Sequence, residues 1–298
     1  MIPASQITQL WTSFFHAQVP AEPLALFRIF IGVILVLNGL LLLPIFQEFC
    51  GPRGVVSDRC WRQSIHSRNL CLLHYLPAGS SSRWLFLMGH LLACAAFLTG
   101  WHFQVASVLV FVSLVSIHHR NPWCLSSADS LLRLITFICC FSPAPAAIWT
   151  LESTGLPNGC ITVEAWPARL IQILVCSVYL RTVCWKLRGS LWKNGTAAWY
   201  PLWADAWVRL RPPRWMLVPL TISMATRGTI LLELALAFGL WISDVRLPLL
   251  LAGIAMHLVF DLILNLQLFS WVMITCLLLF LTPPEATSVF NLLTQNFS

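Results

Sequence analysis

The chain has 298 residues, of which 58% are hydrophobic and only 10% carry a formal charge. Soluble domains have about a quarter of their residues charged, so this composition predicts an integral membrane protein and leaves little sequence for a soluble domain. The net charge of +7 would suggest a nucleic-acid partner in a soluble protein. Here the basic residues gather between apolar runs, where membrane topology accounts for them, and no nucleic acid is indicated.

The N-terminal segment, residues 1–23, predicts an amphipathic helix. Its apolar residues recur at helical spacing on one face, and polar residues occupy the remaining positions. The apolar positions are Ile7, Leu10, Trp11, Phe14 and Phe15. We expect this helix to lie either on the membrane surface or against the helical bundle, and the spacing does not choose between these two arrangements.

Eight apolar stretches follow, and an α-helix needs about 20 such residues to cross a bilayer. They lie near 24–46, 84–100, 103–118, 131–149, 168–187, 228–243, 247–265 and 267–282. The predicted fold is therefore all-α, a polytopic membrane helical bundle with about eight transmembrane helices. We expect one transmembrane domain over residues 24–282 and a short tail over 283–298.

Basic residues concentrate in the connections after the first and fifth predicted spans. With eight spans, both connections lie on one side of the membrane, and the positive-inside rule makes that side cytoplasmic. One span more or fewer between the two connections would place them on opposite sides. The residues are Arg53, Arg59, Arg62, Arg68 and Arg83 in the first connection, and Arg188, Lys193, Arg209, Arg211 and Arg214 in the second.

The eleven cysteines form no Cys-x-x-Cys motif, and most are expected to act as small hydrophobic residues. Cys50, Cys60 and Cys71 share one connection and could form a disulfide if that connection faced an oxidising compartment, which its arginines argue against. Adjacent histidines such as His118 and His119 point about 100° apart on a helix. This is a poor arrangement for zinc, so no metal is expected.

The stretch HHRNPWCLSSADSLLRL predicts a sharp turn between the third and fourth spans. Asn121 and Pro122 should end the third helix, because proline lacks an N–H and disfavours helical geometry in the residue before it. Ser126 and Asp129 have the spacing of a capping box that opens the fourth helix, and Arg133 follows Asp129 by one turn. The polar residues that would end the third helix are His118, His119 and Arg120.

Several ionisable residues fall inside the predicted spans. Placing one ionisable side chain at the bilayer centre costs from about 2.5 to more than 10 kcal/mol, so each should face the bundle interior and have a partner. They are Arg28, Arg133, Arg181, Glu233, His257 and Asp261. The spacing of His257, Asp261 and Asn265 places them on one helical face, either as a hydrogen-bond ladder between helices or as a proton relay or ligand site. Glu233 is more typical of a structural ion pair with an arginine.

Lys186 lies at the C-terminal end of the fifth predicted span. Its side chain can extend to the membrane interface, which its position favours. Alternatively, it can lie in a pocket as a neutral amine, where burial lowers the pKa of a lysine and makes it a usable base.

Five stretches resemble, in order and roughly in spacing, the horizontally transferred transmembrane domain family, which is related to vitamin K-dependent gamma-carboxylase. They are LALFRIFIGVILVLNGLLLLP, HHRNPWCLSSADSLLRL, YLRTVCWKLRGSLWKNGTAAWY, TRGTILLELALAFGL and MHLVFDLILNLQLFSWVM. The resemblance covers the chain from Leu24 to Leu281. Its most specific part is HHRNP followed by an aspartate and LLRL.

The resemblance implies a bundle whose polar residues converge on a site for a reduced, vitamin K-like quinone and a peptide glutamate. In the carboxylase, a lysine deprotonates the reduced quinone, whose reaction with oxygen yields a strong base. That base removes a proton from the glutamate γ-carbon, and carbon dioxide adds. Lys186 matches that lysine in its motif context, and His257 matches a family histidine that would orient or stabilise an anion.

The sequence departs from the family pattern in two respects. Val183, Cys184 and Trp185 precede the lysine where small residues are usual, which would narrow the pocket or redirect the side chain. The large soluble domain that binds substrate in the carboxylase has no recognisable counterpart, so the sequence shows no source of peptide recognition.

The leading hypothesis is an enzyme of the bacterial inner membrane that uses a lipid quinone to modify a small peptide. Lys186 would be the base, and His257 and Asp261 a proton relay. The cofactor would contact Arg133, Glu233, His118, His119 and Arg120. The alternative is a maturation scaffold or immunity factor that holds a small peptide or toxin, with its charges paired structurally. Anion transport is disfavoured because no inverted repeat appears, and the oligomeric state is left open.

Overall fold

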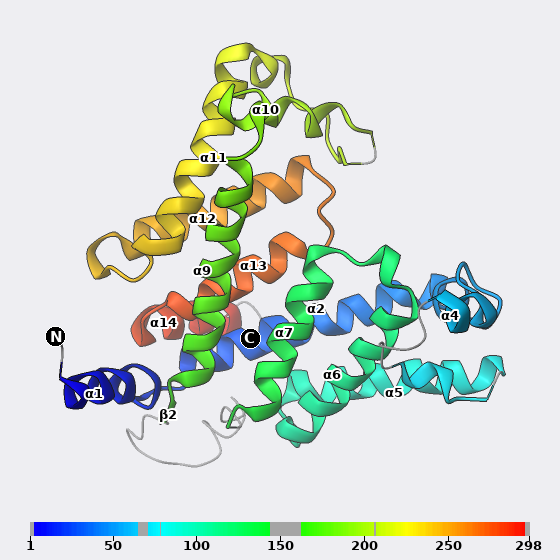
Figure 1. Cartoon of the computed structure of the whole chain (residues 1–298). Coiled ribbons are helices and arrows are strands. Elements are labelled where there is room, and N and C mark those ends of the chain that lie inside the picture. Colours follow the sequence, from blue (N-terminus) through cyan, green and yellow to red (C-terminus); the bar gives the residue numbers. More distant parts are fainter. Residues whose placement is uncertain (1–2, 65–70, 78, 144–161, 206, 296–298) are drawn as a thin grey trace. The chain divides into compact units, whose positions relative to one another are not determined.

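The computed structural model describes the chain except residues 1–2, 65–70, 78, 144–161, 206 and 296–298 (Figure 1). Nearly all its elements are helices, so the predicted all-α class is confirmed. In the described residues, the one sheet pairs β1 (Gln18–Pro20) with β2 (Thr162–Glu164) in antiparallel register. The chain forms two compact units, residues 1–167 and 168–298.

In the first unit, α2 packs against α5, α5 against α6, and α6 against α7. Gly32 permits the close approach of α2 to α5, because a Cβ atom at this position would lie 2.7 Å from the Cα atom of Leu98. The elements are α1 (Ala4–Phe15), α2 (Glu22–Leu42), η1 (Leu43–Ile45), α3 (Phe46–Cys50), α4 (Asp58–Ser64), η2 (Leu72–His74), α5 (Ser80–Thr99), α6 (Phe103–Arg120), η3 (Pro122–Cys124) and α7 (Ser127–Phe141).

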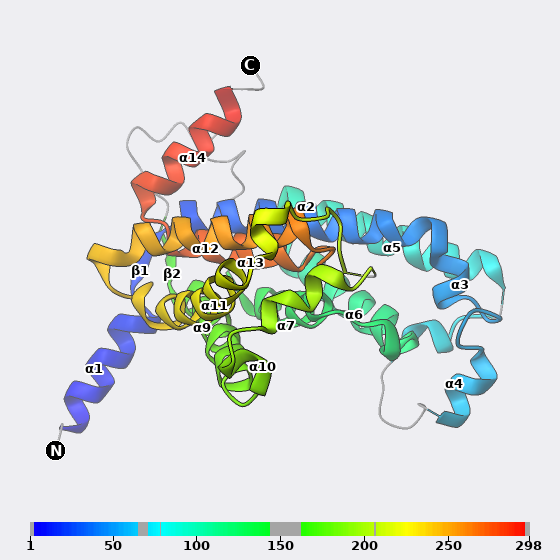
Figure 2. The ribbon, with the colours of Figure 1, turned by 90° about the horizontal axis from the view of Figure 1, so that it is seen from above.

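In the second unit, α11 packs against α12 and α12 against α13, while α14 extends away from α12 and α13 (Figure 2). The side chain of Gln172 on α9 donates to the carbonyl of Leu279 at 2.7 Å and ties α9 to this group. The elements are α9 (Trp166–Lys186, which begins at the unit boundary), α10 (Ser190–Lys193), η4 (Ala197–Trp199), η5 (Pro201–Trp203), η6 (Arg214–Leu217), α11 (Pro219–Gly239), α12 (Ser243–Ile263), α13 (Phe269–Leu277), η7 (Leu278–Phe280) and α14 (Pro283–Gln295).

Six helical stretches of the described chain are long and apolar enough to cross a membrane, which makes this a multi-pass integral membrane protein. They are Glu22–Cys50, Ser81–Thr99, Phe103–Arg120, Trp166–Lys186, Pro219–Gly239 and Ser243–Ile263. The count of about eight is therefore approximate. The helices in the remaining two predicted spans are shorter: α7 ends at Phe141, and the last apolar helical stretch covers Phe269–Phe280. Residues 144–149 of the fourth predicted span lie outside the described residues.

The sixth span begins nine residues earlier than predicted, at Pro219 instead of residue 228. The predicted bounds began after Arg227, whereas α11 includes this arginine, whose side chain is exposed. The helix begins at Pro219 because a proline is tolerated in the first turn, where its missing N–H costs no hydrogen bond.

The turn between α6 and α7 forms as predicted. Helix α6 ends at Arg120, immediately before Asn121 and Pro122. The hydroxyl of Ser126 accepts the N–H of Asp129 at 3.3 Å, and the Asp129 carboxylate accepts the N–H of Ser126 at 2.7 Å. The capping box is therefore confirmed.

Ser126→Ala is expected to lower the free energy of unfolding by about 1 kcal/mol, because it leaves an N–H of the first turn of α7 without its acceptor. Chemical denaturation in detergent measures this cost. Ser127→Ala, one position further into the same helix, is the matched control and should change stability by less than about 0.5 kcal/mol. Equal effects of the two substitutions would contradict the capping role of Ser126.

Asp58 joins two buried arginines of the first unit. Its carboxylate accepts Arg83 at 2.8 Å and Arg120 at 2.9 Å. The guanidinium groups also donate to backbone carbonyls, Arg83 to Cys50 and Arg120 to Gly51. The prediction that Arg83 belongs to an interhelical loop is wrong: it lies in the first turn of α5 and is 1% exposed. Asp58 in α4 makes this burial possible by supplying the opposite charge.

Of the other arginines predicted for this connection, Arg68 falls outside the described residues, and only the backbone of Arg62 is described. The thiols of Cys50, Cys60 and Cys71 are free, and the first and last of them are buried. Burial raises the pKa of the Cys71 thiol, which keeps it protonated.

The predicted N-terminal helix is present as α1. Ile7, Leu10 and Trp11 are each more than half exposed. The apolar face is thus not covered by the described part of the protein, which favours a position on the membrane surface over packing against the bundle.

The tail expected over residues 283–298 contains α14, whose start is tied to α12. Glu285 accepts the N–H of Thr282 at 2.7 Å and pairs with Arg246 at 3.0 Å. Partial burial acts to raise the pKa of Glu285, but these hydrogen bonds and the charge of Arg246 outweigh it and hold the pKa below its usual range.

Candidate functional site

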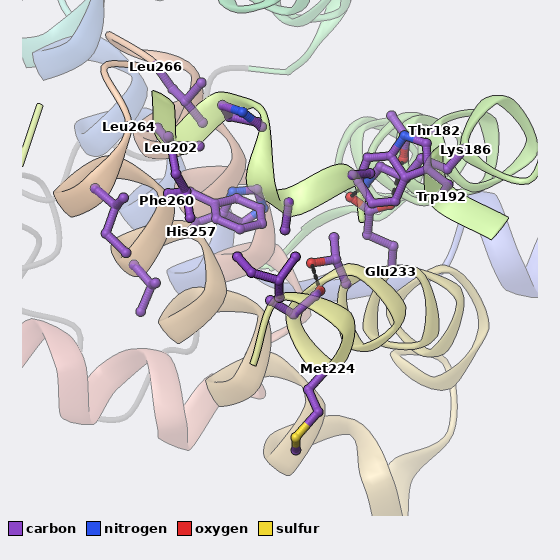
Figure 3. A pocket seen from close by; sticks show the side chains of 18 of the residues that line it. Thr182, Lys186, Trp192, Leu202, Met224, Glu233, His257, Phe260, Leu264 and Leu266 are labelled. Atoms are coloured by element: carbon purple, nitrogen blue, oxygen red, sulfur yellow. Dashed lines mark hydrogen bonds and ion pairs between the residues drawn. The ribbon is translucent and has the colours of Figure 1, made fainter. Parts of the chain in front are cut away.

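The second unit contains a pocket of about 580 Å³ (Figure 3). Helices α9, α11, α12 and α13 line it, together with the connection between α9 and α11. Most of the lining is apolar. Its ionisable side chains are Tyr179, Lys186, Glu233 and His257.

Lys186 and Glu233 form an ion pair in the pocket wall. The Lys186 Nζ atom lies 2.5 Å from Oε1 of Glu233, and Thr182 donates to Oε2 of the same carboxylate at 3.1 Å. The ammonium group also lies over the ring of Trp192, 4.7 Å from its centroid, where a cation–π interaction stabilises its charge. Side-chain exposure is 16% for Lys186 and 8% for Glu233.

This pair corrects two expectations. Lys186 does not extend away from the protein, although its place at the end of α9 favours that arrangement. Glu233 pairs with this lysine and not with an arginine. The physical reason is the position of α11, which brings a carboxylate within reach of Nζ, so the attraction replaces the hydration that the ammonium would gain at the interface.

His257 bonds to Tyr179. The phenol oxygen of Tyr179 lies 2.8 Å from Nε2 of His257, and both side chains are 2% exposed. Nδ1 of His257 is buried and has no hydrogen-bond partner in the described structure. The ring is flanked by Phe260 and Phe269, with centroids 6.3 Å and 6.2 Å away. The pocket wall therefore contains a buried imidazole, one nitrogen of which has no hydrogen-bond partner in the described structure.

The predicted stripe on α12 is wrong at its last position. The helix ends at Ile263, so Asn265 lies beyond it, and its N–H donates to the carbonyl of Trp207 at 2.6 Å. Asp261 pairs with Arg209 at 3.3 Å, whereas His257 bonds to Tyr179. The polar residues of α12 thus take separate partners on other elements.

The remaining predicted cofactor residues belong to the first unit. His118 lies 3.5 Å from Asp129, and Arg133 lies 3.5 Å from His119. Arg120 is occupied by Asp58. That these residues form one cofactor site together with those of the pocket stays a prediction.

Sequence reasoning missed Tyr179, Thr182 and Trp192. The first two were detectable, because Tyr179, Thr182 and Lys186 are spaced by three and four residues and so share one face of an apolar helix. Trp192 lies beyond the end of α9 and gave no such signal. Among the described residues, no cluster of three or more His, Cys, Asp or Glu side chains is arranged to hold a metal.

The fold defines a polytopic helical membrane protein with a mainly apolar pocket among the helices of its second unit. The chain belongs to the HTTM family, whose domain model matches residues 16–284. This domain is a membrane domain of the gamma-carboxylase type. Neither the curated proteins nor the solved structures gave a match to the chain.

Proposed function

We propose that the protein is a membrane enzyme that binds a reduced, quinone-like lipid in the pocket of the second unit and uses it to modify a peptide. The observation that carries this proposal is the Lys186–Glu233 pair in the wall of an apolar pocket. An apolar pocket admits a lipid-soluble ring, and the pair supplies a proton acceptor at its edge.

The pocket suits such a ligand in size and chemistry. Its volume of about 580 Å³ lies within the usual range of small-molecule sites, which is roughly 300–1,000 Å³. Trp192, Phe260 and Phe269 would contact a flat ring, and these aromatic side chains are part of the lining. The free Nδ1 of His257 would bond to a ring oxygen, since a buried polar nitrogen without a partner is costly.

Lys186 would act as the base through its pair with Glu233. An ammonium group has no lone pair, so Lys186 would first have to pass a proton to Glu233, whose Oε1 lies 2.5 Å from Nζ. This leaves a neutral amine whose lone pair accepts a proton from an acidic O–H group. Thr182 holds Glu233 in place for this exchange through its bond to Oε2.

Tyr179 would orient His257. The phenol donates to Nε2 when the imidazole carries its hydrogen on Nδ1, and Nδ1–H then points to an acceptor on the ligand. In this arrangement His257 would hold a ligand oxygen that carries negative charge. Asp261, bound by Arg209, would maintain the end of α12 and not serve as a relay.

When bound, a reduced quinone supplies reducing electrons and, with oxygen, the base strength needed to remove a proton from carbon. By analogy with the carboxylase-type domain, the modification would be the addition of carbon dioxide to a glutamate of the peptide. The substrate would be a small peptide and the location the inner membrane of a bacterium. Helices of the second unit that cross the membrane would give a lipid cofactor direct access from the bilayer.

Mass spectrometry of lipids that co-purify with the detergent-solubilised protein tests the proposal. The wild type is expected to retain a quinone. His257→Ala should retain about tenfold less, because it removes the hydrogen bond to the ligand. His16→Ala is the control, since this histidine lies outside the pocket and is half exposed. If no sample retains a quinone and His257→Ala functions normally in cells, the enzymatic proposal fails and the scaffold alternative remains.

A further inference from the structure

The connection between α9 and α11, residues 187–218, must lie at one membrane surface. Both α9 and α11 are long and apolar enough to cross the bilayer, and they are consecutive candidate spans. A segment that joins two such spans begins and ends on the same side of the membrane. Apart from residue 206, the structure describes this connection as one short helix, α10, and three 3-10 turns, η4, η5 and η6 (Figure 1).

The connection is rich in exposed aromatic residues. It holds five of the fifteen tryptophans of the chain and one of its three tyrosines. Trp203, Trp207 and Trp215 are each more than half exposed, and so is Tyr200. Such rings would be unfavourable in bulk water, whereas tryptophan and tyrosine are enriched where the hydrocarbon meets the headgroups. The exposed rings therefore indicate contact with the interface of the bilayer.

The same connection carries a strong positive charge. It has five basic residues and one acidic residue, Asp205. Asp261 neutralises Arg209, while the other four basic side chains are exposed and make no ion pair with the described residues. They are Arg188, Lys193, Arg211 and Arg214.

We propose that this connection is a binding surface for anionic phospholipids. The exposed tryptophans would lie among the headgroups, and the guanidinium groups of Arg211 and Arg214 would bind lipid phosphates, which their planar fork matches geometrically. Pro212 and Pro213 separate these two arginines and limit their backbone freedom, so less conformational entropy is lost when both bind. The headgroups of a zwitterionic bilayer can contact the tryptophan rings, but they carry no net negative charge to pair with the basic side chains. The charge excess therefore selects an anionic lipid.

The surface is next to the pocket. Trp192, Leu202 and Trp215 of the connection also line the pocket wall. Anionic lipid bound here would thus hold the pocket wall at the depth of the headgroups. The proposal rests on the exposure and charge of the connection and does not require that the pocket bind a quinone.

Native mass spectrometry of the full-length protein tests the proposal. Protein from mixed micelles with equal phosphatidylglycerol and phosphatidylcholine should retain mainly phosphatidylglycerol. Arg211→Gln with Arg214→Gln should retain about tenfold less of it, because each basic residue near an anionic surface contributes about fivefold to binding and detergent screens part of this effect. Both side chains are exposed, so the fold should persist, and thermal unfolding of the variant verifies that.

The matched control is Arg53→Gln with Arg59→Gln, which removes the same charge from two exposed arginines of the first unit. This control should retain phosphatidylglycerol at the level of the wild type. Equal retention by all three proteins, equal loss in the two double variants, or no preference for phosphatidylglycerol in the wild type would overturn the proposal. A dimer in the wild-type spectrum that disappears only in the Arg211/Arg214 variant, with lipid retention unchanged, would assign the surface to a second copy of the chain instead.

Discussion

Asp58→Asn is expected to destabilise the first unit by about 3–5 kcal/mol, measured as a shift in chemical denaturation in detergent. The carboxylate is the shared partner of Arg83 and Arg120, whose exposures are 1% and 0%. The asparagine removes the negative charge and leaves two guanidinium groups close together and buried. The cost comes from these uncompensated charges and not from the loss of Asp58 itself, whose side chain is 24% exposed.

Asp205→Asn is the matched control, because it changes the same functional group at an exposed position. It should alter the free energy of unfolding by less than about 0.5 kcal/mol. If the two substitutions had equal effects, the network around Asp58 would not be the support of α4, α5 and α6 that the structure indicates.

Lys186→Met is expected to cost about 3–5 kcal/mol, because it leaves the Glu233 carboxylate buried in an apolar pocket without its ammonium partner. The double variant Lys186→Met with Glu233→Leu removes both charges at similar volume. It should recover most of the stability, to within about 1–2 kcal/mol of the wild type. Thermal unfolding of the wild type, Lys186→Met, Glu233→Leu and the double variant completes the double-mutant cycle.

The same cycle separates folding from function. The double variant is expected to fold but to lose any activity that needs proton transfer at Nζ of Lys186. If Lys186→Met alone cost less than about 1 kcal/mol, the pair would behave like an exposed salt bridge. A folded double variant with full activity in cells would show that the pair is structural and would support the scaffold alternative.

Apolar length was sufficient to predict the helical membrane fold, because no soluble arrangement accommodates so many continuous apolar runs. The turn at Asn121 and Pro122 and the capping box at Ser126 were predictable since both depend on local chemistry alone. The start of α11 at Pro219 was not predictable, because polar residues interrupt the apolar ones between Pro219 and Gly228 and continuous apolar length begins only after them.

The site was predictable only in part. Lys186 and His257 stood out by their resemblance to a family motif, and both line the pocket. Their partners were not predictable: Glu233 lies 47 residues from Lys186, and Tyr179 lies 78 residues from His257. Pairing across such distances depends on how helices pack. The periodicity of α12 likewise could not show that the helix ends before Asn265.

As the base, Lys186 would accept a proton from a ring hydroxyl of a ligand in the pocket. Calorimetric titration of the purified protein with a hydroquinone and with its dimethyl ether measures what that hydroxyl contributes to binding. The wild type should bind the hydroquinone at least about tenfold more tightly, since the ether has no O–H to donate. The Lys186→Met/Glu233→Leu variant should bind both equally. Equal affinity of the wild type for the two compounds would contradict the claim.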